Sequence, residues 1–412
     1  MLRKNVLLPI FLVVLLDLIG VGIIIPVLAP MFIAHDSPLL PPDTPLAARS
    51  IVFGLLLSIY PIALFFGAPI LGALSDKHGR RKVLMITITA TAASYILFGA
   101  GILMQKIPLL FLSRALAGFA GGNVSVAMSA VADISDEKSK PKNFGIIGMA
   151  FGFGFIIGPF IGGKLADSTV LPWFNFATPF WFAALLSALN FMLVARFFSE
   201  TLNVRSAVHV SPLTGFRNLA KAASMPNLRI LFLVIFLYWL GFNFFTQFFQ
   251  AYMVEKFSYN QGQIGDLFAY IGLWIIFTQG VLVRLVSRFF SPEQTIRASL
   301  LALSIAMAVL LLPSQAYQFF ILLPFVSVSN GLTFPNSTAL VSGLAGKESQ
   351  GEIMGITQSV QAAGLAIPPI ISGFIFSMNE HLPIIAASGF LLLAWAVFSF
   401  GYRPRQEKFH EV

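Results

Sequence analysis

The chain has 412 residues, of which 57% are hydrophobic and only 10% are charged. Ordinary soluble domains carry about 25% charged residues, so this composition excludes a typical soluble protein and indicates one embedded in a membrane. The net charge of +9 could suggest a nucleic-acid partner. The basic residues lie in short segments between apolar stretches, however, so we expect no nucleic acid. The absence of cysteine excludes disulfides and thiolate metal sites.

Twelve apolar stretches are long enough to cross the roughly 30 Å hydrocarbon core of a bilayer. They predict an all-α integral membrane protein with twelve transmembrane helices at 6–32, 51–74, 83–104, 109–131, 144–166, 175–197, 230–254, 264–286, 296–313, 317–343, 353–377 and 383–401. The first stretch follows Arg3 and Lys4 but is too long for the core of a signal peptide, so we expect it to be retained.

The positions of lysine and arginine predict how the chain crosses the membrane. With both termini in the cytoplasm, 21 of the 26 Lys and Arg residues lie on the cytoplasmic side, and Arg114 lies within a span. The four on the outer side are Arg49, Lys106, Lys164 and Lys256. Cytoplasmic loops carry the excess positive charge, so we predict a multi-pass protein of the cell (inner) membrane with both termini cytoplasmic.

Charged residues occur within two spans of the first half. Asp17 lies in the first span and Arg114 in the fourth. Either charge at the centre of a span costs about 2.5–3.5 kcal/mol, so such residues usually face a cavity or one another. Asp133 and Asp167 lie near the ends of the fourth and fifth spans, where we expect them to be solvated.

The loop expected after the second span reads Gly72-Ala73-Leu74-Ser75-Asp76-Lys77-His78-Gly79-Arg80-Arg81-Lys82. A cytoplasmic loop rich in positive charge would account for its lysines and arginines. It would not account for the glycines or for the aspartate, so we predict a specific role for this segment.

The fifth span carries a regular series of small residues, Gly145-x8-Gly154-x3-Gly158-Pro159-x2-Gly162-Gly163. In a soluble helix each glycine costs about 1 kcal/mol relative to alanine, and proline costs about 3 kcal/mol. In a membrane, glycines let helix backbones approach closely, and neighbours satisfy the groups that proline leaves unpaired. We expect close helix packing here; a packing seam without further meaning is the alternative interpretation.

An internal repeat divides the chain into two related halves. Adding 210 to each position of the glycine series gives Gly355, Gly364, Pro368, Pro369, Ser372 and Gly373 in the eleventh span. The same offset relates Gly121 to Gly331. Halves of this kind place a substrate site at their interface near the bilayer midplane, and rocking of the halves gives alternating access.

We predict three parts along the chain: an N-terminal six-helix bundle (1–197), a cytoplasmic linker (198–228) and a C-terminal six-helix bundle with a short cytoplasmic tail (229–412). Within the linker, Ser211-Pro212 is typical of an N-cap followed by proline at the first helical position. Leu213, Phe216 and Leu219 then repeat at helical spacing, which predicts a short amphipathic helix on the membrane surface.

The second half offers polar side chains without charge inside its spans. Amides facing lipid would be costly, so these side chains should face a central cavity or bond across helices. They are Asn243, Gln247 and Gln250 on one face of the seventh span, Asn330 and Asn336 in the tenth, and Gln358 and Gln361 in the eleventh. Phenylalanines surround the first group, which predicts an apolar substrate pocket suited to an amphipathic or planar aromatic compound.

These patterns resemble motifs of the major facilitator superfamily, and the likeness covers essentially the whole chain. The glycine series resembles the antiporter motif of the superfamily's proton-coupled exporters, which its symporters generally lack. The segment 72–82 resembles the superfamily's cytoplasmic signature. Asp17-x2-Gly20-x-Gly22-x3-Pro26 and Arg114-x3-Gly118-x2-Gly121-Gly122 resemble motifs of its drug–proton antiporters, in particular bacterial tetracycline/proton antiporters and multidrug exporters.

The resemblance implies the major facilitator fold of two pseudo-symmetric six-helix bundles, with proton coupling by Asp17 and Arg114. It also implies a charge latch between the second and eleventh spans that holds the outward-facing state without contacting substrate. The residues of this latch, or conformational switch, would be Gly72, Asp76, Gly79, Arg80 and Arg81. The antiporter motif would comprise Gly145, Gly154, Gly158, Pro159, Gly162 and Gly163.

The resemblance therefore predicts proton-coupled efflux of a small amphipathic or aromatic compound, such as a drug, by a monomer that uses no cofactor or metal. Its partners would be the substrate, protons and the lipid bilayer. Tetracycline exporters carry an Asp-Tyr pair in the third span where this chain has Ser94-Tyr95, so the likeness does not extend to tetracycline as the substrate. Export of an endogenous metabolite or siderophore, and proton-driven import, remain alternatives.

No residue pattern indicates an enzyme. The five histidines are expected in loops or tails, and neither a His-Glu-x-x-His nor a Gly-x-Ser-x-Gly motif occurs. A passive channel would require neither the Asp17/Arg114 pair nor two duplicated halves. The sequence therefore favours a secondary active transporter.

Overall fold

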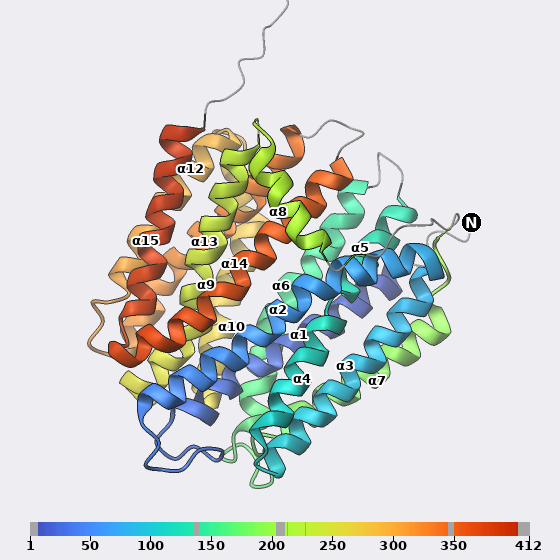
Figure 1. Cartoon of the computed structure of the whole chain (residues 1–412). Coiled ribbons are helices and arrows are strands. Elements are labelled where there is room, and N and C mark those ends of the chain that lie inside the picture. The colour runs from blue at the N-terminus through green and yellow to red at the C-terminus, as the bar shows by residue number, and fades with distance from the viewer. Residues whose placement is uncertain are drawn as a thin grey trace, which may run out of the picture.

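The structure is a computed structural model that describes residues 7–135, 140–202, 211, 213–226, 228–344 and 350–402. All regular structure in these ranges is helical, as the apolar composition predicts (Figure 1). The predicted tail after residue 402 lies outside the described residues.

The helices of the first half are α1 (Leu7–Ile33), α2 (Leu46–His78), α3 (Arg80–Leu103), α4 (Ile107–Ala120), α5 (Asn123–Asp133), α6 (Lys140–Ala166) and α7 (Thr178–Phe197). The short helix α8 (Thr214–Ser224) follows. The second half contains α9 (Arg229–Phe257), α10 (Gln261–Phe277), a π-helical turn (Thr278–Leu282), α11 (Val283–Val286), α12 (Pro292–Val309), a 3₁₀ turn (Ala316–Gln318), α13 (Phe319–Leu344), α14 (Gln350–Met378), α15 (Leu382–Ala396) and a final π-helical turn (Val397–Gly401).

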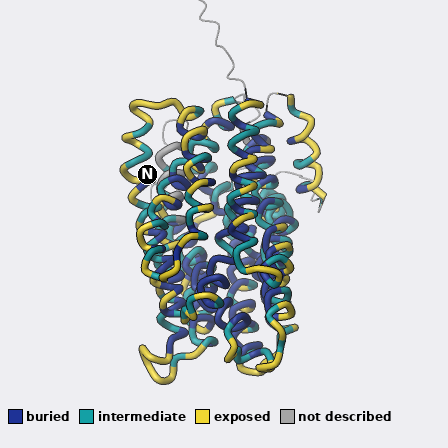
Figure 2. Tube along the Cα trace, turned by 90° about the vertical axis from the view of Figure 1, so that its left-hand side faces the viewer, coloured by how far each residue is buried: buried dark blue, intermediate teal, exposed yellow. Residues whose placement is uncertain are grey.

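Ten helical segments in the described ranges are long and apolar enough to cross a membrane, with α4–α5 and α10–α11 each forming one crossing. Helix α6 has 27 residues and α12 has 18, and they complete the twelve predicted crossings. Large apolar side chains such as Leu103, Phe197, Phe325 and Phe400 are exposed, as lipid-facing residues must be. Figure 2 shows exposed residues along the outer edges of the molecule and at both ends, with buried residues between them. The protein is therefore an all-α integral membrane protein.

The two six-helix bundles are related by a pseudo-twofold arrangement. Contacts between them are concentrated in two helix pairs, α2 with α14 and α6 with α10. The internal repeat makes α10 the counterpart of α2 and α14 the counterpart of α6. Exchanging the halves thus converts one pair into the other, as expected for duplicated bundles.

The two ends of the molecule differ, and we name them by α8. The α8 end carries α8 and the junction of α2 with α3; the far end carries the connections from α1 to α2 and from α6 to α7 (Figure 1). Helix α8 contacts both halves: the Phe216 ring lies 5.2 Å from that of Phe65 on α2, and the Asn218 amide donates to Ser359 Oγ on α14 at 3.0 Å.

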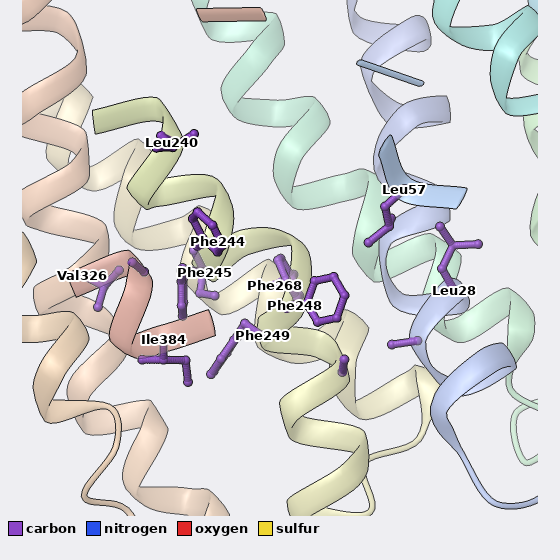
Figure 3. Close-up of a cluster of buried hydrophobic side chains, with 14 of the residues drawn as sticks. Leu28, Leu57, Leu240, Phe244, Phe245, Phe248, Phe249, Phe268, Val326 and Ile384 are labelled. Carbon is purple, nitrogen blue, oxygen red and sulfur yellow. The ribbon is translucent and has the colours of Figure 1, made fainter. Parts of the chain in front are cut away.

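The apolar core runs through both halves. Phe244, Phe245, Phe248 and Phe249 follow one another along α9 and meet residues of α1, α2 and α10 (Figure 3). The rings of Phe248 and Phe53 on α2 lie 5.1 Å apart, edge to face. Most of the phenylalanines around the predicted amide stripe are thus buried packing residues.

Three local features differ from the sequence-based expectations. The segment 72–82 is not a loop, because α2 continues to His78 and α3 begins at Arg80. Only Gly79 separates them, at a φ of 100° that glycine adopts without strain. The fourth span is divided at Gly121 and Gly122. Helix α8 begins at Thr214, and Ser211 does not cap it; its Oγ accepts from the Leu213 amide instead. Pro212 lies outside the described residues.

Candidate functional site

Asp17 and Arg114, predicted from sequence to act together, face the same small cavity. Its volume is about 10 Å³, room for roughly one water molecule. Both side chains are buried, with 9% and 6% of their residue surface exposed. The lining residues come from the first four helices: Asp17, Val21, Ile24, Tyr60, Thr91, Tyr95, Arg114, Ala117 and Gly121.

Arg114 is not paired with Asp17 in this conformation. No ion pair within 4.0 Å joins these two described residues. The guanidinium carbon instead lies 4.6 Å from the centre of the Tyr60 ring. Its Nε and Nη1 atoms are buried and have no hydrogen-bond partner in the described part of the chain. A buried guanidinium with two unpaired nitrogens carries a large desolvation cost, so its position needs a compensating interaction such as the contact with the Tyr60 ring.

Two tyrosines enclose the charged pair because glycines make room for them. A β-carbon on Gly20 would lie 2.6 Å from the Tyr95 hydroxyl, and one on Gly121 would lie 2.7 Å from the Tyr60 hydroxyl. At both distances a β-carbon would force the hydroxyl to move. The first and fourth spans therefore carry glycine near their charged residue so that a hydroxyl can approach.

Polar residues beside the charged pair were missed by the sequence analysis. Asn123 on α5 is the polar neighbour of the Asp17 carboxyl, and both of its amide atoms are buried without a regular hydrogen bond. Thr91 lines the cavity with an unpaired hydroxyl. Each is a single polar residue in an apolar span, a signal that the sequence offers but does not distinguish from packing.

The glycine series of α6 packs directly on the part of α1 that follows Asp17. A β-carbon on Gly158 would lie 2.8 Å from both the Gly22 Cα and the Ile19 carbonyl oxygen. Gly154 contacts Leu18, and Gly162 contacts Ile23 too closely for a β-carbon. The prediction of close helix packing is confirmed for these glycines. The surroundings of Gly145 lie outside the described residues.

An adjacent face of α6 contacts the second half at the far end. A β-carbon on Gly163 would lie 3.0 Å from the Cα of Gly265 on α10. At the next residue of each helix, Lys164 Nζ lies 2.8 Å from an Asp266 carboxylate oxygen. Helix α6 thus connects the turn that bears Asp17 to the interface between the halves.

The predicted switch residues form a charged cluster within their own half. Arg80 Nη1 lies 2.5 Å from Asp76 Oδ1, and Arg80 Nε lies 3.0 Å from Asp133 Oδ2. The Glu200 carboxylate accepts from the backbone amides of Arg80 and Arg81 at 2.9 and 3.2 Å, and so caps α3 in place of an N-cap side chain. Gly79 packs against the same carboxylate, whereas Gly72 has only one neighbour at 3.9 Å.

Two acids expected to be solvated have specific partners instead. Asp133 binds Arg80 and accepts from Thr201 Oγ1 at 3.1 Å, because the end of α5 meets the start of α3. Asp167 is buried, and its Oδ1 accepts from the amide and the hydroxyl of Thr169 at 2.9 and 2.8 Å. Its other oxygen lies against Gly262 of the second half.

The amides proposed for substrate binding have varied surroundings. Asn243 is buried and donates to the Trp239 carbonyl of its own helix at 2.8 Å, and Asn336 likewise donates to the Leu332 carbonyl at 2.7 Å. Asn330 accepts from the Tyr238 hydroxyl at 2.5 Å. Gln250 is buried, Gln247 and Gln361 are half-buried, and Gln358 is exposed.

Aromatic side chains gather beside these amides. The rings of Tyr238 and Phe242 stack at 6.1 Å, and the Trp239 ring meets that of Phe334 on α13 at 5.7 Å. Trp239 packs on Gly364 of α14, so three helices of the second half meet here.

Membrane-spanning helices in two related halves, with a buried acid and a buried arginine in one half, define a membrane transporter. The sequence model of the Major Facilitator Superfamily matches residues 10–367 and, in a second overlapping match, residues 231–412. The chain belongs to the Major Facilitator Superfamily, whose members are transporters and not enzymes. Its fold is the predicted major facilitator fold.

Relatives confirm the predicted likeness to drug exporters. Tetracycline resistance protein, class H, of Pasteurella multocida is 28% identical over 383 residues, covering 90% of this chain and 88% of that protein. Multidrug resistance protein 1 of Bacillus subtilis (strain 168) is 30% identical over 399 residues, covering 96% of each. The crystal structure of the human organic anion transporter MFSD10 matches with a TM-score of 0.73 over 96% of this chain and 99% of that chain, at 24% identity, which supports the shared fold.

Proposed function

We propose that this transporter exports a small amphipathic or aromatic compound in exchange for protons by alternating access. One observation carries the proposal: the glycine face of α6 packs on the turns of α1 that follow Asp17, and Asp17 shares a cavity with Arg114. The residues that resemble an antiporter motif and those that resemble a proton-coupling pair therefore form one continuous structure. The relatives that are named for tetracycline and multidrug resistance support the direction of transport.

Asp17 is the proton carrier in this proposal and Arg114 its regulator. Exclusion of water favours the neutral form of a carboxyl, whereas an approaching guanidinium favours the carboxylate. A change in the distance between the two side chains can therefore load and release a proton. The cavity between them has room for the water that would connect them.

The α8 end is proposed to face the cytoplasm, which places both termini there in the inner membrane. The three parts 1–197, 198–228 and 229–412 would be two bundles and a cytoplasmic linker of one monomer. Contacts at the far end, including the Lys164–Asp266 ion pair, then correspond to a state closed toward the outside. In this state the switch residues Asp76, Arg80 and Arg81 contact their own half, and the latch to α14 would form in the opposite state.

The substrate is proposed to bind beside the amides and aromatic rings of the second half. Trp239 and Phe242 are half-buried, so they can present ring surface to a planar compound. Asn243, Gln247, Gln250, Asn330, Asn336, Gln358 and Gln361 would supply the hydrogen bonds. An exported metabolite or siderophore of the same chemistry fits this proposal equally.

Everted membrane vesicles with a pH-sensitive dye in the lumen test the proposal. With an acidified lumen, ethidium should accumulate inside the vesicles while the lumen loses protons. Asp17→Asn should abolish both signals, and Asp43→Asn, on an exposed loop, should abolish neither. Uphill accumulation by Asp17→Asn would overturn the assignment. Release of preloaded substrate together with protons would instead establish an importer.

A further inference from the structure

The Tyr60 side chain is held in a fixed position on α2, and it meets a buried cation. Its carbonyl oxygen packs against Gly118 and its hydroxyl against Gly121, so α2 and α4 approach closely around it. The ring faces the Arg114 guanidinium at 4.6 Å. An aromatic face at this distance attracts a cation electrostatically, and the attraction grows when water is excluded.

The helices around this contact form two tightly packed pairs. Helices α2 and α4 are joined through Gly67, Gly118 and Gly122, each too close to the opposite backbone for a β-carbon. Helices α1 and α6 are joined through Gly22 and Gly158 in the same way. Arg114 and Tyr60 thus belong to one pair, and Asp17 belongs to the other.

Each pair is attached to a different helix of the second half. A β-carbon on Gly373 of α14 would lie 2.8 Å from the Ser50 carbonyl oxygen of α2, and Gly163 of α6 packs on Gly265 of α10. Pro61 follows Tyr60 within α2 and removes one backbone hydrogen bond, which allows bending at this point. Rocking of the second half therefore moves the two pairs relative to each other.

We propose that Tyr60 is a positioning residue that holds the Arg114 guanidinium away from Asp17 in this conformation and yields it to the Asp17 carboxylate when the helix pairs move. The inference rests on the proposed proton coupling and adds the contact that controls when Asp17 releases its proton. In the present state, which is closed toward the outside, the ring holds the arginine, so Asp17 can keep the proton that it took up from the outside. When the helix pairs move, the guanidinium pairs with the Asp17 carboxylate and the proton is released toward the cytoplasm.

Among the described residues that line the cavity at Asp17, Arg114 is the only other charged one. Helix α3 presents Tyr95 and Thr91, α5 presents Asn123, and α6 presents glycines. Helix α7 presents Asn190, whose amide donates to the Val13 carbonyl at 3.2 Å. Whether Arg114 contacts the Tyr60 ring or the Asp17 carboxylate is therefore the main electrostatic influence on the proton affinity of Asp17.

The test compares Tyr60→Leu with Tyr60→Phe in purified, lipid-reconstituted protein. The infrared band of a protonated carboxyl, assigned by its loss in Asp17→Asn, measures proton occupancy of Asp17. Without the ring, Arg114 should pair with Asp17, and proton affinity should fall by about tenfold or more. Tyr60→Phe retains the ring and should stay within about twofold of the native protein, since the ring face and not the hydroxyl attracts the cation.

Transport gives a second readout. Tyr60→Leu should lose proton-driven accumulation of ethidium but retain exchange of ethidium across the membrane without a gradient. If Tyr60→Leu does not fold, fluorinated phenylalanines at position 60 weaken the ring's attraction stepwise at nearly constant shape. The proton occupancy should then fall with each added fluorine.

Unchanged proton occupancy in Tyr60→Leu or across the fluorinated series would overturn the inference, and so would a Tyr60→Phe variant as defective as Tyr60→Leu. These outcomes differ from failure of the proposed function. In that case Asp17→Asn itself would keep proton-driven transport.

Discussion

The ammonium group of Lys164 on α6 lies 2.8 Å from the carboxylate of Asp266 on α10, and this ion pair joins the two halves at the far end. Beside it, the amide of Gln261 donates to the Ala166 carbonyl at 3.0 Å. The ion pair follows directly on the Gly163–Gly265 contact, so close backbone packing and charge act on the same pair of helices. This arrangement stabilises the state in which the far end is closed.

Lys164→Ala should shift the protein toward the state that is open at the far end. Both side chains are more than one-third exposed, and such pairs contribute at most about 1 kcal/mol, a roughly fivefold change in populations. The chain has no cysteine, so spin labels can be placed at Val170→Cys and Tyr317→Cys, two exposed far-end positions in opposite halves. Electron-resonance distance measurements should then show more of the longer separation.

Asp266→Ala should have the same effect, and the double variant should add nothing further. High salt should reproduce part of the shift because it screens exposed charges. Lys106→Ala, an exposed residue near the far end, is the matched control and should leave the distances unchanged. Identical distance distributions in Lys164→Ala and the native protein would show that the ion pair does not influence the closed state.

Gly158→Ala should impair the protein although alanine adds a single carbon. That carbon would lie 2.8 Å from the backbone of α1, where neither helix can yield without moving Asp17. Overpacking of this kind costs about 1–3 kcal/mol, so both thermal stability and ethidium efflux should fall. Gly389→Ala on α15 is the control, because nothing lies within 4 Å of the added carbon there. Equal stability and efflux in the two variants would remove the functional meaning of the α6 glycines.

The helices were predictable because membrane spanning imposes long apolar stretches, and the α6 glycines were predictable because close backbone approach needs glycine at regular spacing. The meeting of Asp17 with Arg114 was predicted from a resemblance to known motifs. The contact of Arg114 with the Tyr60 ring was not, because it depends on how α2 and α4 pack. An aromatic residue in an apolar span has no sequence feature that marks it as a partner for a cation.

Other contacts that spacing does not reveal have equally local causes. The amide of Asn243, for example, donates to a carbonyl of its own helix. Asp133 was expected to be solvated because it lies near a span end. It pairs with Arg80 because a one-residue connection at Gly79 brings the start of α3 beside the end of α5.

Substitution of Asp76 and of Asp133 by asparagine should distinguish a role in conformational switching from a role in stability. Both acids bind Arg80, but Asp76 is the more exposed, at 35% against 20% of its side chain. Asp76→Asn should therefore slow ethidium turnover while affinity and thermal stability change little, because it alters the bias between conformations. Asp133→Asn also weakens the bond to Thr201 and should cost about 1.5–3 kcal/mol of stability.

Lys77→Gln, at an exposed position in the last turn of α2, is the control for loss of charge. Turnover and thermal midpoint measured for all three variants decide the prediction. If Asp76→Asn changed which compounds are transported and left turnover unchanged, Asp76 would belong to the substrate site instead of the switch.

The two glycines of the 72–82 segment should respond differently to alanine. Gly79 has a φ of 100° and a ψ of 147°, a conformation that costs other residues about 1–3 kcal/mol, and a β-carbon there would also meet the Glu200 carboxylate that caps α3. Gly72 lies within α2, and its nearest neighbour would be 3.9 Å from an added carbon.

Gly79→Ala should therefore lower the thermal midpoint in detergent and loosen the α2–α3 junction, detectable as faster hydrogen exchange at the amides of Arg80 and Arg81. Gly72→Ala should leave stability unchanged or raise it slightly, because alanine favours the helix. Equal destabilisation by both substitutions would mean that Gly72 contacts a partner only in another conformation, and would direct attention to α14 as that partner.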